Sequence, residues 1–177
     1  MMRKILYVLP LVVLIGAAGL MLRSNTNNDM QGATLIYHSN VCVYKNGELI
    51  SCSPNVLTNA GKELIEAYLS QGGTLGAVKY IAVGNGTAPS ASSTSLDNEI
   101  TDCGLARAAG TYSNVGTGNW SFSYTWTCTC DGVTVNTTGI FNASSGGTML
   151  AGNSFNPSTL YTNDELTVTW RLWVTEG

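Results

Sequence analysis

The sequence predicts an all-β protein: an antiparallel β-sandwich, of jelly-roll or immunoglobulin type, with one short helix. Only 11% of the residues are charged, and Ser, Thr, Asn and Gly dominate the polar positions. Residues 120–130 alternate strictly between aromatic or cysteine side chains and Ser or Thr, which is the pattern of a strand with one buried face. Turn pairs such as Asn46-Gly47 and Asp131-Gly132 separate further β-patterned segments. Composition, alternation and tight turns thus agree on the fold class.

The first residues predict export. Arg3 and Lys4 precede an apolar run over residues 5–22, the order found in signal peptides and N-terminal membrane anchors. We expect residues 1–23 to form an apolar helix that is either cleaved as a signal peptide or kept as a membrane anchor, and the remaining chain to lie outside the cell. Contact with a membrane is expected only through residues 5–22, and only if they are uncleaved.

The exported part is predicted to have two regions. Residues 24–40 form a flexible arm that carries a strand at 32–39, and residues 41–177 form a single sandwich domain. Loss of the three basic residues within 1–23 lowers the formal net charge from −3 to −6. Because the exported part is acidic and poor in Lys and Arg, no nucleic-acid partner is expected.

Turn signals and periodicity place the elements of the sandwich in order. Residues 41–52 form a hairpin, and Thr58 and Asn59 cap a helix over residues 60–70. Strands are expected at 78–84, 120–130, 149–155 and 165–175, with a surface loop at 85–94. In the last strand Trp173 falls on the polar face, which makes it the candidate for an exposed contact.

A two-residue turn at Asp131-Gly132 predicts that residues 120–130 pair with the segment that follows the turn. The register then sets Val135 opposite Cys128, Gly139 opposite Tyr124 and Phe141 opposite Phe122.

The glycosylation candidates are the Asn-x-Ser/Thr sequons at Asn85, Asn119, Asn136 and Asn142, although a chain rich in Thr and Asn also produces sequons by chance. The predicted hairpin register directs Asn136 and Asn142 outward, where a glycan is tolerated.

The five cysteines of an exported chain are disulfide candidates: Cys42, Cys52, Cys103, Cys128 and Cys130. A three-residue hairpin loop with a bulge sets Cys42 opposite Cys52, whereas a strict two-residue turn sets them on opposite faces. Cys128 and Cys130 lie too far apart along one strand to bond readily to each other. Cys103 is therefore expected to pair with one of them, which leaves one thiol free.

No arrangement of residues in the sequence indicates catalysis. A hydrolase needs a nucleophile beside a base, or two neighbouring carboxylates, whereas the single His38 lies on the arm and the acidic residues are scattered through turns and the helix. Cys128-x-Cys130 lacks the usual zinc spacing, and Asp97, Glu99 and Asp102 match no calcium loop. We expect no enzymatic activity, no catalytic residue, no metal and no cofactor.

Several segments after residue 50 resemble a β-sandwich family. The segments are Asn-Val-Leu-Thr-Asn-Ala-Gly-Lys at 55–62, Tyr-Ile-Ala-Val-Gly-Asn-Gly-Thr at 80–87, Leu-Asp-Asn-Glu-Ile at 96–100, Gly-Ile-Phe-Asn-Ala at 139–143 and Asp-Glu-Leu-Thr-Val-Thr-Trp at 164–170. The pattern is similar to viral tail structural proteins and to exported surface-filament subunits of archaea, the thread-like pili. The export segment favours the filament over the virus.

For thread-like filaments the resemblance implies a head-to-tail homopolymer joined by donor-strand complementation, in which an N-terminal strand of one subunit completes the sheet of the next. Ala33, Leu35 and Tyr37 share one face of residues 32–39, and we expect them to be the inserted face. The alternative is that this segment pairs within its own chain.

The predicted function is therefore that of an extracellular filament subunit for adhesion or cell–cell contact. The alternatives are a secreted or membrane-tethered adhesion module that binds surface glycans, and a tail or surface component of a virion.

Overall fold

The computed structural model describes residues 34–71 and 75–177. Within these residues the chain forms two five-stranded antiparallel sheets and one helix, which confirms the predicted β-sandwich with a short helix. The predicted apolar helix of residues 1–23 and the arm before Thr34 lie outside the described residues.

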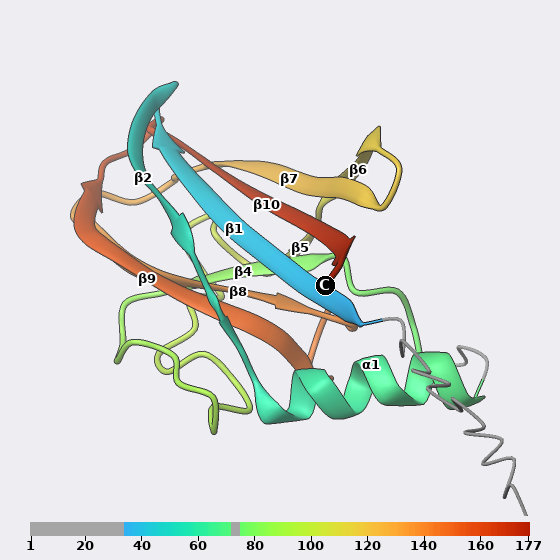
Figure 1. Cartoon of the computed structure of the whole chain (residues 1–177). Coiled ribbons are helices and arrows are strands. Elements are labelled where there is room, and N and C mark those ends of the chain that lie inside the picture. Colours follow the sequence, from blue (N-terminus) through green and yellow to red (C-terminus); the bar gives the residue numbers. More distant parts are fainter. Residues whose placement is uncertain (1–33, 72–74) are drawn as a thin grey trace, which may run out of the picture. The chain divides into compact units, whose positions relative to one another are not determined.

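The first and last strands of the sandwich are neighbours. The elements, in chain order, are β1 (Leu35–Lys45), β2 (Glu48–Pro54), β3 (Val56–Leu57), α1 (Asn59–Gln71), β4 (Tyr80–Gly84), β5 (Ala108–Ala109), β6 (Thr111–Gly116), β7 (Asn119–Thr127), β8 (Val133–Phe141), β9 (Met149–Leu160) and β10 (Glu165–Glu176). One sheet has the order β2-β1-β10-β7-β6 and the other β3-β9-β8-β4-β5. Figure 1 shows β1 between β2 and β10, and α1 near the end of the sandwich at which β1 begins.

Alternating apolar positions of the two sheets meet in the core. In β10, Leu166, Val168, Trp170 and Leu172 are buried and the residues between them are more exposed, as the sequence pattern predicts. Burial of an apolar side chain of this size stabilises the fold by about 1.5–3 kcal/mol relative to leaving it in water. This face of β10 therefore holds the two sheets together.

The β1–β2 hairpin contains both a tight turn and a bulge. The turn residues Asn46 and Gly47 have positive φ angles of 49° and 80°. A two-residue turn alone would set the cysteines on opposite faces, but an extra residue in β2, Ile50, shifts the register by one. Cys42 consequently lies directly opposite Cys52.

Helix α1 begins where the sequence predicts. Thr58 caps it, because its Oγ1 accepts a hydrogen bond of 2.8 Å from the backbone N–H of Gly61. A Cβ at Gly61 would collide with the backbone of Leu150 in β9, so the glycine lets α1 lie close to the sheet. Leu64 is buried beneath the helix and Ile65 packs against the core.

The predicted pairing of residues 120–130 with the segment after Asp131-Gly132 is wrong. β7 pairs with β10 and β6, whereas β8 pairs with β4 and β9 in the other sheet. Gly139 lies opposite Ala82 and Gly152 instead of Tyr124, Val135 opposite Ser158 instead of Cys128, and Phe141 opposite Tyr80 and Met149 instead of Phe122.

The physical reason is a crossing between the sheets. β7 ends at Thr127, and residues 128–132 run from one sheet to the other. Backbone hydrogen bonds to Asp164 and Cys103 fix this crossing, as does the disulfide between Cys103 and Cys130. The turn at Asp131-Gly132 therefore belongs to a connection between the two sheets and not to a hairpin.

β1 is continuous, so the predicted boundary between arm and domain at residues 40 and 41 falls inside a strand. β1 pairs with β10 along its whole length, but with β2 only from Asn40, which lies opposite Pro54. After Pro54 the chain crosses to β3 in the other sheet. Among the described strands, residues 35–39 therefore have a partner on one side only.

Candidate functional site

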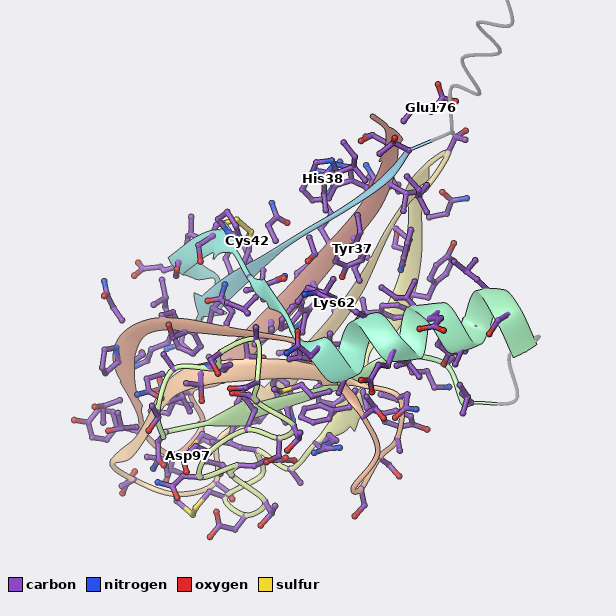
Figure 2. All side chains as sticks on the ribbon, turned by 60° about the horizontal axis from the view of Figure 1, so that its bottom comes forward. Tyr37, His38, Cys42, Lys62, Asp97 and Glu176 are labelled. Atoms are coloured by element: carbon purple, nitrogen blue, oxygen red, sulfur yellow. A yellow bond between two sulfur atoms is a disulfide. The ribbon has the colours of Figure 1, made fainter. Side chains whose placement is uncertain are left out.

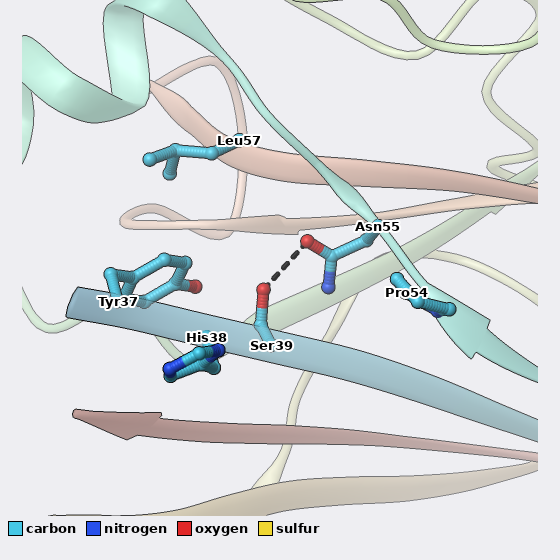
Figure 3. Close-up of a pocket in the computed structure, with 6 residues that line it drawn as sticks. All are labelled: Tyr37, His38, Ser39, Pro54, Asn55 and Leu57. Atoms are coloured by element: carbon cyan, nitrogen blue, oxygen red, sulfur yellow. Dashed lines mark hydrogen bonds between the residues drawn. The ribbon is translucent and has the colours of Figure 1, made fainter. Parts of the chain in front are cut away.

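The candidate site lies around residues 35–39 of β1 and consists of two hollows that share Tyr37. The first, which we call the edge slot, has a volume of about 260 Å³. Its lining residues, drawn in Figure 3, are Tyr37, His38, Ser39, Pro54, Asn55 and Leu57. The edge slot separates the first half of β1 from the chain that crosses between β2 and β3.

Polar groups in the edge slot are only partly satisfied. The Ser39 hydroxyl donates a hydrogen bond of 2.6 Å to Asn55 Oδ1. The Tyr37 hydroxyl and Asn55 Nδ2 are buried without a hydrogen-bond partner among the described residues. Burial raises the pKa of Tyr37 to about 12, with the Ser39 hydroxyl opposing the shift in part. Tyr37 therefore stays a neutral hydroxyl at physiological pH, able to donate to a group that enters the slot.

The second hollow, the end groove, has a volume of about 410 Å³ and an almost wholly apolar lining. Its lining residues belong to β1, α1, β7, β9 and β10 and to the segment before β4. The residues are Leu35, Tyr37, Ile65, Tyr68, Leu69, Ala77, Val78, Trp120, Phe122, Leu150, Leu172 and Val174. Leu35 and Leu69 remain 63% and 77% exposed, so apolar surface is in contact with water here.

Beside both hollows, residues 35–39 present a backbone edge that has no partner strand among the described residues. The Thr34 carbonyl accepts a hydrogen bond of 2.8 Å from the N–H of Gly177. Because backbone groups alternate along an antiparallel strand, Leu35 and Tyr37 point theirs away from β10, to the side where β2 has ended. An added strand would satisfy such an edge and cover the groove at once.

Two of the three expected donor residues, Leu35 and Tyr37, lie at this site and pair within their own sheet. Leu35 pairs with Glu176 and Tyr37 with Val174, both in β10 of the same chain, while Ala33 lies outside the described residues. The single chain thus shows the intramolecular pairing that was the alternative expectation. Figure 2 shows Tyr37 and His38 on opposite sides of β1.

Trp173 is less exposed than a free contact residue. It lies on the outer face of β10, where its ring stacks on that of His38 with a centroid distance of 5.2 Å and an interplanar angle of 9°. His38, expected on a flexible arm, is fixed in β1 and its Nε2 lies 3.0 Å from Thr175 Oγ1. One face of the indole is therefore covered.

All five cysteines lie in described residues. Disulfides join Cys42 to Cys52 and Cys103 to Cys130, which confirms one bridge in the hairpin and one between Cys103 and the 128/130 pair. Cys128 is free and buried. Two disulfides indicate that the folded part resides in an oxidising, extracellular environment.

The sequons differ in their surroundings. Asn85 is exposed, whereas Asn119, Asn136 and Asn142 are half-buried and engaged in hydrogen bonds. Asn136 Nδ2 donates to the Gly86 carbonyl, and Asn142 Oδ1 accepts from the N–H of Thr148 at 2.7 Å. Asn85 is thus the sequon whose side chain a glycan would disturb least.

Within residues 34–71 and 75–177, no group of His, Cys, Asp and Glu side chains could hold a metal ion. No helix in the same residues has the length and apolar character needed to cross a membrane. The chain matches no protein-family model, and no curated protein is significantly similar to it.

Two features of the structure, a wall of the end groove and strand β6, did not emerge from the sequence. The sequence predicted the helix over residues 60–70, but not that Ile65, Tyr68 and Leu69 on it form a wall of the end groove. β6 was not predicted as a strand, because all of its residues are exposed and it lacks an apolar alternation. Gly116 at the end of β6 and Gly118 after it are the signal that could have indicated a hairpin.

Proposed function

We propose that the chain is an exported structural subunit of an extracellular filament, which serves adhesion or cell–cell contact. Subunits join when the strand around Ala33, Leu35 and Tyr37 enters the sheet of the next copy. The proposal rests on one observation: the two halves of β1 differ in the number of strands that they pair with. Residues 35–39 pair with β10 alone, whereas the strand from Asn40 onward lies between two partners.

A covalent link strengthens this division of β1. The disulfide between Cys42 and Cys52 ties the second half of β1 to β2, just beyond Asn40. Release of residues 35–39 therefore breaks only their backbone pairing with β10 and removes their side chains from the end groove. The rest of the sandwich keeps its contacts. Residues 35–39 are the exchangeable half of β1 and residues 40–45 the fixed half.

Exchange between copies conserves the interactions that it breaks. Residues 35–39 of one copy can pair with β10 of the next in the same register, and their apolar side chains enter the same groove. Such a contact joins different surfaces of the two copies, so it continues into a fibre without closing. The sequence resemblance to thread-like filaments supports the same arrangement.

Leu35 provides the test of this proposal. The full chain, expressed with its own export segment, is compared with Leu35→Asp by electron microscopy and sedimentation. Leu35 is 63% exposed in the single chain, so the fold should survive, while a carboxylate should not enter the apolar groove of the next copy. We expect loss of fibres with an unchanged circular dichroism spectrum.

The matched control is Leu49→Asp in β2, because Leu49 is 58% exposed and does not line the end groove. We expect Leu49→Asp to polymerise like the natural chain. Normal fibres from Leu35→Asp, or equal losses in the two variants, would contradict strand donation.

A glycan-binding module receives less support. Its candidate Trp173 is half-buried and has one face against His38, so only the other face is open to a sugar ring.

A further inference from the structure

β6 is the most exposed sheet edge in the described part of the chain. All six of its residues are exposed, including Tyr112 at 58% and Val115 at 48%. The strand contains neither a charged residue nor a proline, the side chains that commonly protect an edge from pairing with another chain. Other edges are short or interrupted: β3 and β5 have two residues each, and β2 carries Glu48, Pro54 and a bulge.

The outer backbone groups of β6 can be assigned from the ladder that leads to it. The N–H of Val174 donates to the Gly118 carbonyl, so the even-numbered residues of β10 point their backbone groups toward β7. Because backbone groups alternate along β7 as well, its odd-numbered residues direct their N–H and C=O groups toward β6, where they pair with Thr111 and Ser113. Tyr112 and Asn114 consequently direct their N–H and C=O groups away from the sheet.

We propose that β6 of one copy adds to residues 35–39 of a second copy, along the edge that no described strand pairs with. The sheet β2-β1-β10-β7-β6 then continues from molecule to molecule. This inference gives the proposed filament a second contact, and it rests on that function for its setting. It does not require strand donation, because residues 35–39 present the same edge whether they come from the same copy or from a neighbour.

The partner is a second copy of the chain, because one chain carries both the added strand, β6, and the edge that receives it. β6 pairs regularly over Thr111–Asn114 before its bulge, close in length to the five residues of the open edge. β1, β10, β7 and β6 alternate in direction, so a copy shifted sideways in the plane of the sheet presents β6 antiparallel to β1. The two edges lie on opposite sides of the sheet, so the contact is head-to-tail.

The side chains of β6 suit the edge slot. Tyr112 lies on the inner face of the sheet, where its ring is tilted against Phe122 at a centroid distance of 5.7 Å. In the added strand, that face is directed to the edge slot of the second copy. There the phenol and backbone groups of Tyr112 meet the Tyr37 hydroxyl and Asn55 Nδ2, which have no hydrogen-bond partner in the part of the chain that the structure describes.

Hydrogen exchange of the assembled, unmodified protein tests the inference without a variant. The amides of Tyr112, Asn114, Leu35 and Tyr37 should exchange at least tenfold more slowly in the assembly than in the single chain, a factor on the order of that expected for one new backbone hydrogen bond. The amide of Ser113, which already faces β7, is the internal control and should change little. Equal exchange of the four outward amides in both states overturns the edge pairing.

Substitutions at Tyr112 give the second measurement. Tyr112→Pro removes the outward N–H, whereas Tyr112→Ala removes the side chain and keeps that N–H. We expect Tyr112→Pro to reduce the assembled fraction by about tenfold, the value of one backbone hydrogen bond, with a smaller loss in Tyr112→Ala. Assembly of Tyr112→Pro equal to that of Tyr112→Ala overturns the inference.

The two proposals fail separately. Fibres that need Leu35 but leave the four outward amides unprotected contradict the edge pairing alone. Protected outward amides in fibres that tolerate Leu35→Asp contradict strand donation alone.

Discussion

Tyr37 of β1 lies directly opposite Val174 of β10, so the first strand of the sandwich pairs with the last. Both side chains line the end groove. The pair thus joins the segment proposed for donation to the strand proposed to receive it, and the proposed donation requires this contact to form between copies.

The Tyr37 hydroxyl should contribute nothing to the stability of the single chain. It is buried without a hydrogen-bond partner among the described residues, and such a group costs about 1–3 kcal/mol in lost hydration. We therefore expect Tyr37→Phe to leave the free energy of unfolding unchanged or to raise it by about 1 kcal/mol. Urea unfolding of the unassembled protein measures this. A loss of stability would indicate that the hydroxyl is hydrogen-bonded in the single chain.

The two tryptophans of β10 should differ in their contribution to the fold. Trp170 is fully buried between the sheets, whereas Trp173 is half-buried on the outer face. Trp170→Ala should lower the free energy of unfolding by about 3–5 kcal/mol because it leaves a large cavity. Trp173→Ala is the matched control and should cost clearly less. Equal costs in urea unfolding would show that the alternation of β10 does not define the core.

The disulfides should differ according to the loops that they close. Cys103 and Cys130 are separated by 27 residues and Cys42 and Cys52 by 10. On the chain-entropy relation these loops give about 3.6 and about 2.7 kcal/mol of stabilisation. Replacing both cysteines of the longer loop by Ala should therefore lower the melting temperature more than the same change in the hairpin. The reverse order would contradict this account of the bridges.

Asp164 should support the fold at moderately low pH. Its pKa lies at about 2, below the ordinary 3.8, because the Asn46 amide, the Tyr161 backbone N–H and Lys45 all stabilise the carboxylate. A lowered folded-state pKa gives stability that is present above about pH 4 and is lost as the pH falls through about 2. The melting temperature of the natural chain should exceed that of Asp164→Asn at pH 6, and the difference should vanish near pH 2. A difference independent of pH would exclude the carboxylate as its source.

The sequence predicted elements whose signals are local. The buried alternation of β10, the Thr58 cap of α1 and the turn at Asn46-Gly47 depend on neighbouring residues, and each is present in the structure. The partner of β7 depends instead on where residues 128–132 lead the chain. The Cys103–Cys130 bridge and hydrogen bonds to distant loops determine that path, and no local pattern contains them.

The candidate site was harder to predict for the same reason. Leu35 and Tyr37 could be chosen from strand alternation, but the end groove forms only where α1, β7 and β10 meet them. The open edge results from the end of β2 at Pro54 and the crossing to β3. Both features depend on the relative lengths of strands that the sequence pattern defines only approximately.

Disulfide trapping distinguishes donation of residues 35–39 to a neighbouring copy from pairing within one chain. Leu35→Cys and Glu176→Cys are combined in the full chain, with Cys128→Ala to remove the free thiol; the new cysteines lie directly opposite each other in β1 and β10. The control combines Val43→Cys with Val168→Cys, which are opposite each other in the fixed half of β1. After oxidation of assembled protein, denaturing gels without reductant should show a ladder of covalent multimers for the first pair and monomers for the control. Monomers alone for the Leu35–Glu176 pair, in protein that has formed fibres, would show that the strand stays in its own chain and would contradict strand donation.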